Sequence, residues 1–584
     1  MGIKEKLSAF FERYIYISGL NYTPREYADI FIKRMIAAMA AILVLLISSL
    51  LLKFSPFLST NLPPNLSKDL PNILMIMAFI VLGGIFFASL EPVFKALEIV
   101  GQTEREMPYV ASLLTIYASA GIPPHLALSR IGEKADLFPG THLLVRRIQK
   151  LRSLFVLDEL DAIEAEARKI PSTVVSDILF SAAGAERGGG SIYIVFKDKM
   201  KSFFAELKER YKKLGEQMKL IGDIILIFFG VLPMTMYTMF TLFASPGIVS
   251  IAFLFSFIIV PFIGAVLSMI VDTMYPKTPM KYTKYYRRLV YSIPLGIVAF
   301  AIVYTVLSTP QLMPTIKETA LAAFFEKAQK YKTAISLDVA FIAVLFKEAI
   351  SFMRDNRRLT SIEMALPSFV RDLTEEIRKG YTPSQALDRL LELRSYGKHL
   401  DNLLREVSSA VKIGHTLSEA VQFIKNKVSW RTAVIFEIIG DADRLGAKAD
   451  VFEEITDVTR EIIDAIKIAK SGTVGIRLFG LVTAGLVMGV MALLVNMVLS
   501  RIAELSDIVI EAQMRVGQGL MMGFSLITKD LLAPLVDSIS IGVVISALIL
   551  GLLTGKMSDG VLASGFLYAI LTLLITLIIL LVMM

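Results

Sequence analysis

The residues of this chain that could perform chemistry do not form a nucleotide-hydrolysing site. A P-loop needs the pattern G-x-x-x-x-G-K-S/T, whereas Lys556, which follows Gly555, is followed by Met557. The glycine-rich run from Arg187 to Ser191 is not preceded by a strand pattern, which argues against a nucleotide loop there. We therefore predict that the protein is not an enzyme and needs no cofactor, and that any ATP it depends on is hydrolysed by another chain.

Metal or proteolytic chemistry has no better support. The chain has no cysteine, and its histidines form no H-x-x-x-H pair. The histidines are His125, His142, His399 and His415. An intramembrane aspartyl protease would need two carboxylates that meet near mid-membrane, whereas Asp223, Asp272 and Asp338 lie near the ends of apolar runs. We interpret these three as interfacial residues, and we predict no metal site.

One pairing of charged residues occurs twice. Glu186-Arg187 is followed after one residue by Gly189, and Asp443-Arg444 is followed in the same way by Gly446, 257 residues later. An acid, an arginine and then a glycine are typical of the end of one helix and the start of the next. Two interpretations stay open: a capped turn between packed helices, or a surface that faces a partner.

A second element also occurs twice. The stretch Met107–Leu128 aligns without a gap with Leu366–Leu387, a constant 259 residues later. The aligned pairs are Pro108 with Pro367, Gly121 with Gly380, Pro124 with Pro383, Ala127 with Ala386, and Leu128 with Leu387. The chain therefore contains one module in two copies.

The elements that carry these motifs are predicted to be helices. In the second copy Phe369, Leu373 and Ile377 form an apolar stripe at spacings of four, with charges opposite. Gly380 stands where a left-handed cap would end that helix, and Thr382-Pro383 supplies an N-cap and a proline at the first helical position. The pattern predicts helix, tight turn, helix. We expect two all-helical bundles of about six helices each, with Pro108, Gly121, Pro124, Pro367, Gly380 and Pro383 as structural turn residues.

The composition places the rest of the chain in a membrane. Of the 584 residues, 55% are hydrophobic, and the mean hydropathy is +0.63, which is typical of a polytopic membrane protein. Apolar runs of about 18 residues or more can span a bilayer. Clear runs lie at 35–52, 71–90, 220–244, 248–271, 290–307, 475–500, 537–555 and 561–584.

A ninth span is inferred from the repeat. Two copies of one module should face the same side of the membrane, which requires an even number of crossings between them. Three clear runs lie between the copies, so the weak segment 331–350 is predicted to be the fourth, although it contains Asp338. Lys332 and Lys347 could reach the two interfaces from its ends. We thus predict an all-α polytopic protein with about nine spans and two cytoplasmic bundles.

These spans divide the chain into six parts. They are a cytoplasmic N-terminal segment, 1–34; two transmembrane helices, 35–90; the first cytoplasmic bundle, 91–218; four transmembrane helices, 219–347; the second bundle, 348–474; and three transmembrane helices, 475–584.

Basic residues set the predicted orientation, because short loops rich in Lys and Arg stay in the cytoplasm. The loop 276–289 has no acidic residue and five basic ones, Lys277, Lys281, Lys284, Arg287 and Arg288. The N-terminus and both bundles are then cytoplasmic, and the C-terminus is outside the cell membrane. Much of the net charge of +8 lies in such membrane-flanking segments. It therefore indicates topology, and we predict no nucleic-acid partner.

The repeated motifs resemble the type II secretion F family, the membrane platforms of secretion systems, type IV pili and the archaellum. The matching residues are Pro108, Gly121, Pro124, Ala127, Glu186 and Gly189, and again Pro367, Gly380, Pro383, Ala386, Asp443 and Gly446. The chain length and the arrangement of spans look more like the archaeal branch of that family. The resemblance implies a platform that docks a cytoplasmic hexameric secretion ATPase and couples it to a filament of pilin-like subunits.

If the resemblance holds, the ATPase should contact exposed cytoplasmic charges, and a homo-dimer in the lipid membrane would suit a hexameric ring. The candidate partner-binding residues are Glu186, Arg187, Asp443, Arg444, Arg146, Arg147, Lys150, Arg152, Lys281, Lys284, Arg287 and Arg288. The alternative functions are a multi-span transporter or channel with cytoplasmic regulatory domains, and a scaffold that recruits partners without moving. Carriers usually repeat their spans, whereas here the clear repeat lies between them.

Overall fold

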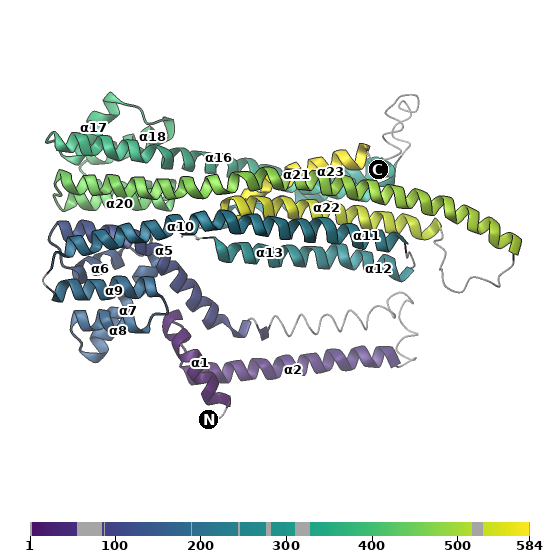
Figure 1. Ribbon diagram of the computed structural model, residues 1–584, viewed down its shortest axis with the longest axis horizontal. Coiled ribbons are helices and arrows are strands. Elements are labelled where there is room, and N and C mark those ends of the chain that lie inside the picture. The colour runs from purple at the N-terminus through teal and green to yellow at the C-terminus, as the bar shows by residue number, and fades with distance from the viewer. Residues whose placement is uncertain are drawn as a thin grey trace. The chain divides into compact units, whose positions relative to one another are not determined.

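The computed structural model describes residues 3–54, 85–86, 88–188, 190–242, 246–275, 282–309, 328–516 and 529–582. Within these ranges the chain is almost entirely helical and contains no strand, which confirms the all-α prediction (Figure 1). The chain divides into two compact units, Met1–Lys201 and Ser202–Met584, which are described separately. The boundary falls inside a helix, α10 (Ile192–Leu226).

The first unit begins with two helices, α1 (Ile3–Ser18) and α2 (Pro24–Phe54). The first copy of the module follows as α5 (Glu91–Ser119), α6 (Pro124–Glu133), α7 (Pro139–Phe155), α8 (Glu159–Lys169), α9 (Thr173–Arg187) and the start of α10. Helix α1 packs on α5 through Ile17, Ala96 and Ile99, all of which are buried. The long α5 then forms the spine against which α6, α7 and α9 lie.

The second unit contains the second copy of the module. Its helices are the C-terminal part of α16 (Lys332–Arg378), then α17 (Pro383–Leu393), α18 (Lys398–Lys412), α19 (Leu417–Ile424), the short η4 (Lys425–Lys427), α20 (Trp430–Arg444) and the start of α21 (Ala449–Val516). Counting α5–α10 and α16–α21, each copy has six α-helices in the described residues, which confirms the predicted helix number.

The remaining helices of the second unit are strongly apolar. They are η1 (Ile227–Val231), α11 (Leu232–Leu242), α12 (Pro246–Leu254), η2 (Phe255–Ile259), α13 (Val260–Met274), α14 (Thr283–Ser308), α22 (Lys529–Asp559), η5 (Leu562–Ser564) and α23 (Gly565–Val582). In this unit α16 and α21 run from the bundle into the group of apolar helices (Figure 1). One continuous buried core therefore joins α10–α14, α16 and α21–α23.

Six helices in the described residues are long and apolar enough to cross a membrane. They are Pro24–Ser48, Ile192–Phe240, Gly247–Met274, Thr283–Ser308, Pro534–Asp559 and Leu562–Leu581, and they coincide with six of the predicted spans. Of the others, 71–90 lies almost wholly outside the described residues. The segments 331–350 and 475–500 are helical parts of α16 and α21 but are not among these six. Nine spans therefore stay a prediction.

Asp338, which we interpret as an interfacial residue, lies inside the packed helices of the second unit. Its side chain is fully buried, and neither carboxylate oxygen has a hydrogen-bond partner among the described residues. The reason is its register: Asp338 shares the buried stripe of α16 with Ala334, Ile335 and Leu345. Asp272 lies near the end of α13, and its Oδ1 is 3.2 Å from Lys556 Nζ.

Helices α22 and α23 form an antiparallel pair held at very short range. A Cβ on Gly551 would lie 2.3 Å from Ala569 Cα, and one on Gly555 would lie 2.2 Å from Gly565 Cα. Each helix thus presents two small residues four apart to the other, the pattern that lets membrane helices approach closely. Any larger side chain at these positions would separate the helices.

Matched positions of the two copies also touch. In the part of α10 that belongs to the second unit, a Cβ on Gly215 would lie 3.3 Å from Gly472 Cα on α21. Further along, a Cβ on Gly230 would lie 2.9 Å from Val487 Cγ2. Both pairs are 257 residues apart, the offset of the acid–arginine motif. The two equivalent helices therefore run side by side with equivalent residues in contact.

Candidate functional site: paired turns, exposed tips and a polar pocket

The glycine turn has the same geometry in both copies. Gly121 has a φ of 76° and Gly380 a φ of 97°, which confirms the predicted left-handed conformation. In the first copy Gly121 N donates to Ala118 O and Ile122 N to Tyr117 O, at 3.0 and 2.9 Å. In the second copy Gly380 N donates to Ile377 O, and Tyr381 N to Glu376 O. Both patterns are the Schellman termination of a helix.

The helix after each turn starts at its proline, as predicted, but the two starts are capped differently. Pro124 and Pro383 are the first residues of α6 and α17. Thr382 forms a complete capping box with Gln385, which confirms the predicted N-cap. In the first copy Pro123 occupies the cap position and supplies no side-chain hydrogen bond.

Pro108 and Pro367 are not turn residues, and this part of the prediction is wrong. Pro108 lies inside α5 and Pro367 lies inside α16. In both copies the helix starts well before the aligned stretch, so the proline falls in its interior. The tertiary packing of these long buried helices outweighs the loss of one backbone hydrogen bond.

In the first copy the two repeated motifs meet in space. Glu186, near the end of α9, reaches the start of α6, where its Oε1 lies 2.6 Å from His125 Nδ1. Its Oε2 also accepts a hydrogen bond from the backbone N of His125, at 3.4 Å. A carboxylate at a helix N-terminus is favourable, so Glu186 supplies the cap that Pro123 cannot. In the first copy the contact therefore links the acid–arginine pair to the helix that follows the glycine turn.

In the second copy Asp443 does not cap the following helix, because Thr382 and Gln385 cap α17 locally. No hydrogen bond or ion pair joins the Asp443 carboxylate to another described residue, and partial burial raises its pKa. Gly446, which follows, has a φ of 63°, whereas Gly189 lies outside the described residues. The two copies have therefore diverged at this turn.

The arginines of the motif are engaged within their own bundles. Arg187 pairs with Asp161 and, at 2.6 Å, with Glu164, both on α8. Arg444 Nη2 lies 3.1 Å from Asp441 Oδ1, one turn earlier on α20. For Glu186 and Arg187 the geometry favours the capped turn over the partner-facing surface. Arg444 is still half exposed and forms part of the molecular surface.

The predicted basic patch on α7 is only partly exposed. Arg146 and Lys150 are exposed, and Arg152 is exposed but pairs with Glu159 at 2.5 Å. Arg147 differs from the prediction of a surface residue: its side chain is 13% exposed and pairs with the fully buried Glu166 at 2.6 Å. Arg147 points inward because it follows the buried Leu144 by three residues on the same face of α7.

The membrane-flanking loop gives a mixed result. Lys281 lies outside the described residues. Lys284 Nζ lies 2.8 Å from Asp355 Oδ2 on α16. Arg287 and Arg288 are exposed near the start of α14. The described part of this loop therefore contributes three exposed cations, of which Lys284 also ties α14 to α16.

Sequence reasoning missed an exposed apolar tip that occurs in both copies. At the end of α7, Leu154, Phe155 and Val156 are 64%, 65% and 91% exposed. At the end of α18, Ile413 is 80% exposed, 257 residues after Val156. Val156 has a φ of 51°, a strained conformation for a β-branched residue. The signal was present in the sequence as an apolar triplet that follows the basic patch.

The histidines form contacts of ordinary packing. His125 binds Glu186, His142 Nδ1 lies 2.6 Å from Gly132 O, and His415 packs edge-on against Phe423. In the residues that the structure describes, no group of three or more His, Asp or Glu side chains is arranged to hold a metal ion.

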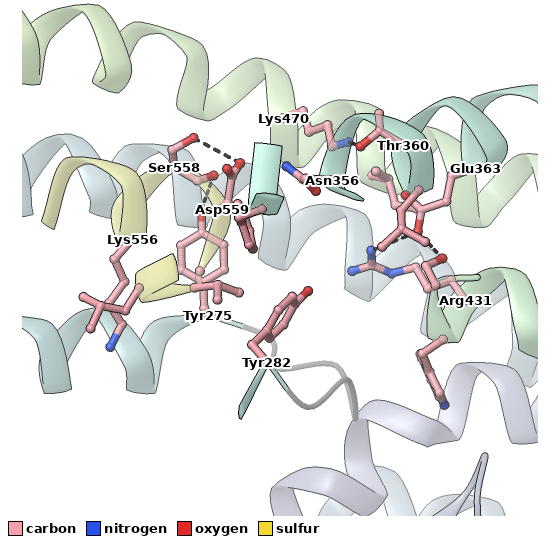
Figure 2. Close-up of a pocket in the computed structure, with 18 of the residues that line it drawn as sticks. Tyr275, Tyr282, Asn356, Thr360, Glu363, Arg431, Lys470, Lys556, Ser558 and Asp559 are labelled. Carbon is pink, nitrogen blue, oxygen red and sulfur yellow. Dashed lines mark hydrogen bonds and ion pairs between the residues drawn. The ribbon is translucent and has the colours of Figure 1, made fainter. Parts of the chain in front are cut away.

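A polar pocket of about 380 Å³ lies in the second unit, and sequence reasoning did not find it. Figure 2 shows Tyr282, Asn356, Arg431 and Asp559 around one space, with Lys470 and Thr360 along its edge. The wall is formed by the C-terminal ends of α13 and α22, the start of α14, the middle of α16 and the start of α20. These segments are distant in the sequence, so no local pattern indicates the pocket.

Comparisons with known proteins add nothing to this geometry: no family model, no curated protein and no solved structure matches the chain.

Proposed function

We propose that this protein is the membrane platform of an archaeal type IV filament machine. It docks a cytoplasmic hexameric secretion ATPase and couples it to the assembly or rotation of an archaellum or pilus. In this proposal nine helices cross the cell membrane, both bundles and the N-terminus face the cytoplasm, and the C-terminus faces outward. The chain works as a homo-dimer beside pilin-like subunits.

The duplication carries the proposal. Each copy has six helices, a left-handed glycine turn, a proline-started helix after it, and an exposed apolar residue at the same turn. Two equivalent bundles suit a partner that is itself built from repeated subunits, because one chain then offers each of two neighbouring subunits the same surface. Carriers usually repeat their membrane spans around a site near the midplane, whereas the motifs that define this repeat lie in the bundles.

The exposed tips and the charges beside them are the surfaces that fit this partner. Large exposed apolar side chains next to basic ones are typical of protein-binding sites. Arg146 and Lys150 are exposed on the helix that ends in the first tip. The same turn of the second copy presents Ile413. Docking at both tips would hold the chain at two points on the ATPase ring, one for each bundle.

The proposal is tested by co-purification of the full chain, in detergent or nanodiscs, with the secretion ATPase encoded nearest to it. We expect a complex that depends on a non-hydrolysable ATP analogue, and its loss when the second bundle is removed. Helices α16 and α21 continue into the apolar helices. Deleting 381–447 therefore removes the second bundle with less damage to the apolar helices than deleting 348–474 would cause. Membrane insertion of the deletion variant is the control.

No complex under any nucleotide condition, with well-folded protein, would contradict the platform function. Substrate flux assays in vesicles would then test the transporter alternative.

A further inference from the structure

The polar pocket lies where apolar helices end. Tyr275 follows α13, Tyr282 precedes α14, and Ser558–Leu562 connects α22 to α23. Aromatic side chains at the ends of apolar helices are typical of the membrane–water interface. Tyr275 closes the pocket on one side: its OH donates to Met557 O at 2.7 Å and to Ser558 O at 2.8 Å, and its ring packs on Gly560.

The carboxylates that line the pocket each have a cationic neighbour in the second unit. Asp272 Oδ1 lies 3.2 Å from Lys556 Nζ. Asp559 Oδ1 lies 2.8 Å from Arg477 Nη2. Glu363 Oε1 accepts a hydrogen bond of 2.5 Å from Ser429 and lies 3.9 Å from Arg431 Nη1. The negative charges of the pocket are therefore already balanced.

Among the described residues, Lys470 is the lining cation that forms no close ion pair, although the carboxylates of Glu363 and Asp559 act on it at longer range. Among the described residues its Nζ contacts one polar group, Thr360 Oγ1, at 3.0 Å. Burial lowers the pKa of Lys470 and outweighs the opposite effect of the Glu363 and Asp559 carboxylates. The pocket thus contains a partly buried positive charge that an anion would stabilise.

The groups around Lys470 suit an oxyanion that carries hydroxyl groups. The amide of the exposed Asn356 has no hydrogen-bond partner among the described residues and faces the same space in Figure 2. Helix α20 starts at the pocket wall with Trp430 and Arg431, and a helix N-terminus attracts negative charge, part of which the Glu363 carboxylate beside Ser429 already supplies. The volume of about 380 Å³ is within the range of small-molecule pockets.

We propose that this pocket binds a phosphate ester, with Lys470 and the start of α20 holding the phosphate and Asn356 a hydroxyl group. Its place at the ends of the apolar helices favours the headgroup of an anionic membrane lipid, and a soluble phosphate ester is the second source of the same chemistry. The proposal is independent of the filament platform.

The single tryptophan of the chain, Trp430, lines the pocket and reports on it. Its fluorescence is followed in the full chain in detergent, in one arm with short-chain phosphatidylglycerol and in another with glycerol 3-phosphate. We expect a saturable change in the lipid arm. The substitution Lys470→Gln should raise the dissociation constant about tenfold, because one charge-assisted hydrogen bond is lost. Lys470→Arg should bind as the wild type does.

Lys467→Gln is the matched control, since Lys467 is on the same helix, 60% exposed and paired with Asp464. It should leave the titration unchanged, and thermal unfolding without ligand checks that all variants fold. Saturation by glycerol 3-phosphate alone, lost in Lys470→Gln, would assign the pocket to a soluble ester. Equal binding by wild type and Lys470→Gln, or no saturable change with either probe, would overturn the proposal.

Discussion

At the scale of single residues, Gly121 shows how one backbone angle holds a turn. Its φ is 76°, and a Cβ placed on it would meet no atom within 4 Å. The glycine is therefore needed for its conformation and not for space. The same is true of Gly380.

The replacement Gly121→Ala should lower the free energy of opening of α5 and α6 by about 1–2 kcal/mol, the cost of a left-handed alanine. Gly184→Ala is the matched control, because Gly184 lies inside α9 with open space around it. It should raise stability by roughly 0.5–1 kcal/mol. Hydrogen exchange of these helices measures the stability change in both variants. Changes of the same sign would contradict the interpretation that Gly121 is needed for its left-handed conformation.

Glu106 is a second residue whose environment has a measurable consequence. Its buried carboxylate accepts hydrogen bonds from Gly140 N at 2.9 Å and from Thr141 N and Oγ1 at 2.7 Å, at the start of α7. Desolvation outweighs these bonds and raises the pKa of Glu106 to about 7, from an ordinary value of 4.5.

The pKa of Glu106 is higher in the folded protein than in the unfolded chain. The stability that protonated Glu106 contributes is therefore fully present below pH 4.5 and is lost as the pH rises through about 7. Between pH 5 and pH 8 the first unit should lose on the order of 2–3 kcal/mol through this residue. Calorimetry of the full chain checks it, with Glu106→Gln as the variant whose pH dependence should be flatter. Equal slopes for the two proteins would show that Glu106 is ionised at pH 5.

At the scale of elements, the α22–α23 pair depends on four small residues. Gly555→Ala would place a Cβ 2.2 Å from Gly565 Cα, so the helices must separate and lose contacts along their length. We expect a destabilisation of about 1–3 kcal/mol, as for overpacking in a core. Gly489→Ala in α21 is the control, because its Cβ would meet nothing within 4 Å. Thermal unfolding in detergent separates the two, and an unchanged Gly555→Ala would show that the pair is looser.

At the scale of the whole molecule, the question is whether the two copies act together. Val156→Gly relieves the left-handed strain and removes the most exposed side chain of the first apolar tip, and Ile413→Ser removes the second tip. If the tips dock the ATPase, the double variant should fold at least as well as the wild type and associate more weakly. Ile194→Ser, at a position 55% exposed on α10, is the control. Undiminished association would remove Val156 and Ile413 from the docking surface while leaving the platform proposal intact.

The sequence alone determined the helical class, the duplicated module, the left-handed turns at Gly121 and Gly380 and the proline starts of α6 and α17. These features depend on periodicity and local backbone conformation, which lie within a few neighbouring residues. Six apolar helices were predictable for the same reason. The wrong assignment of Pro108 and Pro367 shows the limit, because a local helix breaker was overridden by packing that only distant residues supply.

Only the tertiary structure decided which charged side chains form ion pairs within the protein and which are exposed. Arg147 and Arg187 look as exposed in the sequence as Arg146 does, yet Glu166, Asp161 and Glu164 reach the first two from another helix. The pocket around Lys470 is assembled from segments more than 250 residues apart. Ion pairing and cavities depend on three-dimensional distance, and a sequence records only the order of its residues.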